Sequence, residues 1–224
     1  IQCAPAGATP ADFAKSIDLC QFTTESDKKW GVISAEITLP DGSPISYTKN
    51  RAIFDKFGNV IKPLGGSSFA ALSTGDAKFP FPTGDNHVAN QPGFSSNPPK
   101  DWDDYHNHLI PNSPLCTNST AKKYYANDAV MLKLKVRVPT NAKSFSLNAN
   151  FFSTEFPYYV CSDFNDFFLI LLDSQYNTQN PGSALKNPAD KNLAMDDKSN
   201  PVGVNLAMSG LFKECSQDSA DYPA

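Results

Sequence analysis

The stretch STEFPYYVCSDFNDFF, residues 153–168, concentrates the side chains of this chain that are most capable of chemistry. Carboxylates, an amide, a cysteine and several aromatic rings follow one another closely. Calcium binds six to eight oxygen atoms from carboxylates, amides and backbone carbonyls, and a chain reversal between two strands would bring such groups together here. The candidate calcium ligands are Glu155, Asp163, Asn165 and Asp166.

The same residues also allow a hydrolase or a purely structural corner. A glycosidase places two carboxyl groups about 5 to 9 Å apart across a cleft, and Glu155 could form such a pair with Asp163 or Asp166. Alternatively, Asn165 and Asp166 bond the backbone at the start of the next strand, as Asn and Asp do in turns. In that interpretation Pro157 fixes the turn and the acids bind no ligand. The rings that would then pack inward are those of Tyr158, Tyr159 and Phe164.

A second group of candidate binding residues lies in the segment 76–128, which shows no periodicity and contains many prolines and all three histidines. A loop of this length in a compact domain is usually functional or mobile, so we expect it to contact a partner. If His106 and His108 lie on a strand, their rings share a face near two aspartates and could bind zinc. The candidate binding residues are Trp102, Tyr105, His106 and His108.

Strands must position most of these residues, because helix signals are scarce. Thr9 and Pro10 suit the start of a short N-terminal helix. Alternation of apolar and polar residues predicts half-buried strands at 130–138 and 145–152, joined by a short turn. Further strands are expected at 31–39 and 166–174.

These elements make the chain a mainly β protein. Two half-buried neighbouring strands are typical of an antiparallel sandwich, and the chain is long enough to enclose one core. We therefore expect a single antiparallel β-sandwich domain, jelly-roll-like, over residues 1–224. It would carry a short N-terminal helix and one long irregular loop at about 76–128.

The composition of the chain indicates its cellular compartment and the classes of partner that it can bind. The net charge of −4 does not suggest a nucleic-acid partner, which requires a concentrated basic face. No apolar run approaches the roughly 18 residues that a membrane span needs. Five cysteines without a C-x-x-C pair favour structural disulfides in an oxidising compartment, and proximity along the chain favours Cys3–Cys20. The chain begins at Ile1 without a leader, as a processed exported protein would.

Several stretches occur in the order typical of one family: SIDLCQ, WGVISAEITLPDG, ALSTGDA, the block from Asn127 to Phe168, and NPVGVNLAM. Together they resemble the choice-of-anchor L domain family of exported bacterial surface proteins, in its myxobacterial-type form. The resemblance implies that the protein is exported, and it supplies no set of catalytic residues. Under the resemblance, the cysteines that pair among themselves are Cys20, Cys116, Cys161 and Cys215. Within this set we favour Cys116–Cys161, which would join the long loop to the corner.

Together these observations predict an exported bacterial surface or matrix protein that acts as a non-catalytic binding or adhesion module stabilised by calcium. The expected partner is a protein or polysaccharide of the cell surface or matrix. One alternative is a self-associating structural subunit of an extracellular filament or coat. The other is a hydrolase that uses Glu155 with Asp163 or Asp166.

Overall fold

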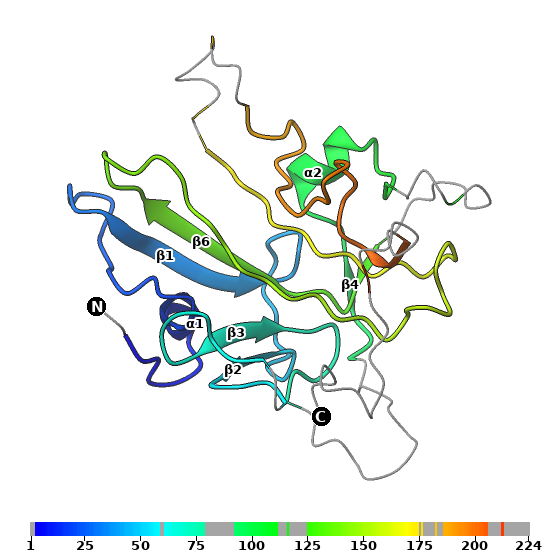
Figure 1. The fold of residues 1–224 in the computed structure, drawn as a ribbon, viewed down its shortest axis with the longest axis horizontal. Helices are drawn as coiled ribbons and strands as arrows, with labels where there is room; N and C mark the ends of the chain where they lie inside the picture. Colours follow the sequence, from blue (N-terminus) through cyan, green and yellow to red (C-terminus); the bar gives the residue numbers. More distant parts are fainter. Residues whose placement is uncertain are drawn as a thin grey trace. The chain divides into compact units, whose positions relative to one another are not determined.

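The computed structural model describes residues 3–58, 61–78, 92–111, 116, 125–174, 176, 182, 186–205 and 212. In these residues strands prevail over helices, as the sequence predicted (Figure 1). The helices are α1 (Pro10–Ser16) and α2 (Lys100–Tyr105). The strands are β1 (Gly31–Thr38), β2 (Arg51–Phe54), β3 (Phe69–Leu72), β4 (Ser95–Ser96), β5 (Ala126–Asn127) and β6 (Met131–Arg137).

The strands form small sheets. Within the described ranges there are three antiparallel pairs, β1–β6, β2–β3 and β4–β5, and no closed barrel. The chain divides into two compact units. Unit 1 comprises Ile1–Asn97, Tyr125–Asn148 and Cys215–Ala224, and unit 2 comprises Pro98–Tyr124 and Ala149–Glu214.

The sheet of β1 and β6 is the longest in unit 1 and follows the alternation in the sequence. Ile37 lies opposite Leu132, and Glu36 lies opposite Lys133. Apolar and opposite-charge pairs of this kind are what stabilise neighbouring antiparallel strands. The predicted strand at 130–138 is therefore confirmed with slightly narrower bounds, and its partner is β1.

The predicted strand at 145–152 is wrong. Residues 141–150 form no strand and are exposed throughout, including the apolar side chains of Phe145 and Leu147. Alternation shows which face of a segment can be buried, but it does not choose the partner. The predicted strand at 166–174 is likewise reduced to isolated bridges, Phe167 to Gly203 and Leu171 to Asn192.

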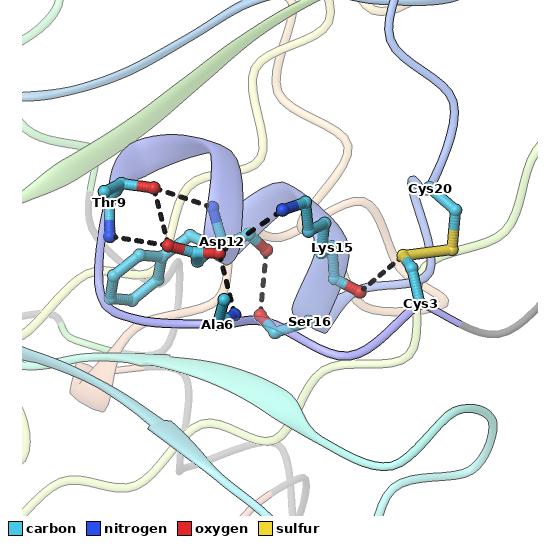
Figure 2. Close-up of polar contacts among 8 residues, drawn as sticks. Cys3, Ala6, Thr9, Asp12, Lys15, Ser16 and Cys20 are labelled. Atoms are coloured by element: carbon cyan, nitrogen blue, oxygen red, sulfur yellow. Dashed lines mark hydrogen bonds and ion pairs between the residues drawn. A yellow bond between two sulfur atoms is a disulfide. The ribbon is translucent and has the colours of Figure 1, made fainter.

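Helix α1 confirms the predicted N-terminal helix, and its start is held by one buried carboxylate. Asp12 accepts hydrogen bonds from the amide and hydroxyl of Thr9, at 3.1 and 2.6 Å, and from the amide of Ala6 at 3.0 Å (Figure 2). Lys15 Nζ lies 3.5 Å from the same carboxylate. The hydrogen bonds from Thr9 and Ala6, with the Lys15 charge, lower the pKa of Asp12 far below its ordinary value.

Two disulfides are present, one in each unit. Cys3 is bonded to Cys20, the pair favoured by proximity, and Cys116 is bonded to Cys161. The pairing of Cys20 within the set implied by the family resemblance is therefore wrong, because Cys20 already has a partner closer in the chain. Cys215 lies outside the described residues. Disulfides persist in oxidising compartments, so the protein belongs to an oxidising or exported environment.

The segment 76–128 is not one irregular loop. It contains β4, α2 and β5, and the first and last of these pair with each other. Phe94 and Asp128 close the pair, because the amide of Phe94 bonds the Asp128 carboxylate at 2.9 Å and the Asp128 amide bonds the Phe94 carbonyl at 2.8 Å. Elements this short leave no periodic signal in the sequence.

No helix in the described part of the chain is long and apolar enough to cross a bilayer.

Candidate functional site

The corner at residues 153–168 belongs to unit 2 and is built around two carboxylates. The Ser153 hydroxyl donates to Asp166 Oδ2 at 2.6 Å and accepts from the Glu155 amide at 3.1 Å. The Asp166 amide donates to Glu155 Oε2 at 3.2 Å. The chain reversal predicted from the sequence therefore brings Glu155 and Asp166 together, and each acid accepts a hydrogen bond from the chain itself.

A second segment, residues 203–205, holds the other side of the corner. Asn165 Oδ1 accepts from the Asn205 amide at 3.1 Å, and Asn205 Oδ1 accepts from the Cys161 amide at 2.6 Å. The Val204 amide donates to the Asp166 carbonyl at 3.0 Å. These bonds satisfy backbone groups that would otherwise be left unpaired. The structural interpretation thus has direct geometric support for Asn165, whereas the Asp166 side chain bonds the Ser153 hydroxyl rather than the backbone.

Burial changes the acidity of both carboxylates. The pKa of Glu155 is raised, first by burial and then by the neighbouring Asp166 charge. The pKa of Asp166 is also raised by burial, and the hydrogen bond from Ser153 opposes this rise. A raised pKa is what a general acid needs, but it is equally the result of burying a structural carboxylate. The internal hydrogen bonds of both groups favour the structural explanation.

The predicted calcium ligands are not arranged as an open oxygen cage. Oxygens of Glu155, Asn165 and Asp166 already accept hydrogen bonds from the chain, and Asp163 is exposed. Calcium gathers six to eight oxygen ligands, so a site here would need further oxygens beside these side chains. Among the described residues, the one trio of acidic, histidine or cysteine ligand atoms within 4.8 Å of one another is in another part of unit 2: Asp103, Asp104 and His108.

The predicted binding residues of α2 divide into buried and exposed side chains. Trp102 is 2% exposed and packs against the rings of His106 and Phe167, with centroids 4.7 and 6.0 Å away. The helix turns this side chain into the core, which does not fit the predicted role of a surface binding residue. Tyr105, by contrast, is exposed.

The two described histidines do not share a face. They follow the helix α2 rather than lying on a strand, and their rings meet different carboxylates. His106 Nε2 lies 3.1 Å from Asp190 Oδ2, and His108 Nδ1 lies 2.7 Å from Asp103 Oδ2. The zinc hypothesis based on a common strand face is therefore wrong for this pair. The third histidine, His87, lies outside the described residues.

Exposed aromatic rings are the feature of the corner that the sequence interpretation missed. The rings do not pack inward: the exposed fractions are 88% for Tyr158, 59% for Phe164 and 47% for Tyr159. Tyr159 and Phe164 meet edge to face, with centroids 5.3 Å apart. We call these three residues the aromatic corner. The sequence did contain a signal for this exposure, namely aromatic residues between a proline and a cysteine in a tight reversal.

Comparison with known proteins does not identify the role of the corner. No family model, curated protein or solved structure matches the chain. The resemblance to the choice-of-anchor L family therefore stays a prediction.

The raised pKa values of the corner predict a specific pH dependence of stability. A carboxylate with a raised folded pKa stabilises the fold fully below its ordinary pKa, and this contribution is lost as the pH rises through the raised value. We therefore expect Glu155→Gln, which resembles the protonated acid, to gain stability relative to the wild type as the pH rises above the ordinary glutamate pKa of 4.5. Urea unfolding at a series of pH values measures the difference.

Asp12 provides the control of opposite sign. The pKa of Asp12 is lowered, so its stabilising contribution to the fold is present at pH values above its ordinary pKa. This contribution is lost as the pH falls. Asp12→Asn should therefore be most destabilising at neutral pH and approach the wild type in acid. A constant difference between Glu155→Gln and the wild type at every pH would contradict the burial of Glu155 as a charged group.

Proposed function

We propose that the chain is an exported, non-catalytic binding module that contacts a surface or matrix component through the aromatic corner. The observation that carries the proposal is the exposure of Tyr158, Tyr159 and Phe164 in one tight reversal, with the rings of Tyr159 and Phe164 in contact. Aromatic side chains bury a large area on contact and tyrosine adds a polar end. For this reason contiguous exposed rings mark interaction sites.

The anchoring of the corner supports the same role. Cys161 lies between the tyrosines and Phe164 and is tied to Cys116 by a disulfide and to Asn205 by its amide. The Tyr159 amide also bonds the Glu155 carbonyl at 2.8 Å. A surface that is ordered before binding avoids part of the entropy cost of association. The acids beneath it serve as supports, and the rings offer the contact surface.

Three finer assignments belong to this proposal. The extracellular or cell-surface location is supported by the two disulfides. The jelly-roll-like sandwich is supported by the antiparallel pairing of the described strands. Membership in the choice-of-anchor L family is supported by the ordered sequence stretches alone. Calcium at the corner remains a prediction, and the binding assay below includes it as a variable.

The test is retention on isolated extracellular matrix. We expect Tyr158→Ala or Phe164→Ala to weaken retention by about tenfold, as for central aromatic contacts. The matched control is Tyr125→Ala, which removes an exposed tyrosine from unit 1. Matrix treated with protease or with periodate separates a protein partner from a polysaccharide, and parallel runs with calcium and with a chelator test the ion.

Two outcomes would contradict the proposal. One is equal loss of retention in Tyr125→Ala and Tyr158→Ala. The other is growth of the free protein into large species during sedimentation, which would favour the filament or coat subunit. That second candidate is supported by the exposed alternating run 145–150, since such a run could add a strand to a sheet of another copy.

A further inference from the structure

Exposed apolar side chains gather at one end of the β1–β6 sheet in unit 1. Trp30 directly precedes β1 and Val138 directly follows β6, and the pairing of Gly31 with Arg137 places both at the same end (Figure 1). We call the group the sheet-end patch. The exposed fractions of its members are 41% for Phe22, 46% for Trp30, 37% for Val136 and 62% for Val138.

Phe22 and Val136 join the patch through the pairing of the strands. Phe22 forms a parallel bridge with Val32, and Val32 lies opposite Val136 in the sheet. Val32 itself is buried, so the exposed side chains lie next to a residue of the core. The close approach of the Phe22 segment requires glycine at position 31, because a Cβ there would lie 2.6 Å from the Gln21 carbonyl oxygen.

The rim of the patch is basic although the whole chain is acidic. The segments 22–30 and 135–143 carry five basic and two acidic residues, against a net charge of −4 for the chain. Lys28 and Lys29 are exposed and form no ion pair within the described part of the chain. Lys15 Nζ lies 6.0 Å from the centroid of the Phe22 ring.

Of the other three basic side chains of these segments, Lys143 is exposed and two are occupied internally. Lys135 forms an ion pair with Glu25, and Arg137 Nη2 donates to the Glu25 carbonyl at 2.9 Å. Asp27 is the second acid and is exposed beside the lysines. The exposed positive charges that remain for a partner are therefore those of Lys28 and Lys29, directly before Trp30 in the chain, and that of Lys143.

We infer that the sheet-end patch docks on an anionic lipid surface. Tryptophan favours the boundary between headgroups and acyl chains, exposed valine and phenylalanine gain by entering it, and lysine is attracted to the lipid phosphates. Binding of this kind combines buried apolar area with charge. An acidic polysaccharide would satisfy the lysines but would gain little from Val136 and Val138, so the lipid surface accounts for more of the patch.

Vesicles test this inference directly. We expect the protein to sediment with vesicles that mix phosphatidylcholine and phosphatidylglycerol, and not with phosphatidylcholine alone. The chain has two tryptophans; Trp102 is buried in unit 2, so a shift of emission to shorter wavelength reports Trp30. Added salt should weaken the binding, because it screens the lysine charges.

Matched variants separate the patch from the rest of the surface. Lys28→Gln and Lys29→Gln should each weaken partitioning by about fivefold, and Val138→Ser should reduce the emission shift. Lys56→Gln and Leu64→Ser, which change exposed residues elsewhere in unit 1, should leave both unchanged. Tyr158→Ala should also leave vesicle binding unchanged, because the inference does not depend on the aromatic corner.

Three results would overturn the inference. The first is failure to sediment with anionic vesicles, and the second is equal binding to neutral and anionic vesicles. The third is an emission shift of Trp30 with soluble polygalacturonate but not with vesicles, which would assign the patch to an acidic polysaccharide.

Discussion

Replacing Cys116 and Cys161 by alanine should lower the free energy of unfolding more than any other change considered for this protein. The bond closes a loop with a sequence separation of 45, and the chain-entropy relation gives about 4 kcal/mol for a loop of this length. That is a large part of the 5–15 kcal/mol that typical domains have. Urea unfolding followed by circular dichroism measures the loss.

The bond between Cys3 and Cys20 is the internal comparison. Its sequence separation is 17, for which the same relation gives about 3 kcal/mol. Every variant should carry Cys215→Ser, so that the fifth cysteine cannot form a replacement bond. A greater loss from the Cys3–Cys20 pair would show that loop length does not decide the ranking.

The disulfide also bears on binding. Cys161 lies within the aromatic corner segment, and its amide bond to Asn205 at 2.6 Å ties the corner to residues 203–205. Loss of the disulfide should therefore weaken retention on matrix under conditions in which the protein is still folded. Unchanged retention would mean that the hydrogen bonds alone order Tyr158 and Phe164.

Replacing Asn192 by leucine should cost about 3 kcal/mol, because leucine has a similar volume but leaves buried backbone groups unpaired. Asn192 is fully buried. Its side-chain oxygen accepts from the Ile170 amide at 3.2 Å and from the Ala194 amide at 3.0 Å, and its nitrogen donates to the Ala194 carbonyl at 3.3 Å. One side chain thus replaces hydrogen bonds that a continuous strand pair would supply.

Asn148→Leu is the matched control, since Asn148 is exposed. We expect it to change the free energy of unfolding by no more than about 0.5 kcal/mol, as for most surface substitutions. Comparable losses in the two variants would indicate that leucine acts through the unfolded chain rather than through the bonds of Asn192. The urea midpoint of each variant, at unchanged slope, decides between these explanations.

Local signals explain what could be predicted about the fold. Helix α1 was predictable because Thr9 and Asp12, three residues apart, form its cap. Strand β6 was predictable because its alternation lies within seven residues. The contact between Glu155 and Asp166 was predictable because a single reversal separates them.

Partner choice was not predictable in the same way. Strand β6 has its complement in β1, about a hundred residues earlier, rather than in the alternating segment that follows it. Trp102 is buried because α2 forms, and a helix of six residues leaves no periodic signal. Asn205 reaches Cys161 across 44 positions of the chain. Each of these contacts joins segments whose pairing no local pattern specifies.

The sequence by itself therefore determined a mainly β, disulfide-containing chain, its N-terminal helix, its principal strand and the reversal that pairs two acids. The tertiary structure alone decided that Glu155 is held by a backbone amide and Asp166 by the Ser153 hydroxyl, that Trp102 is buried, and that the rings of Tyr158 and Phe164 are exposed. The physical reason is that local propensity and periodicity act over a few residues, whereas burial depends on which distant segment covers a side chain.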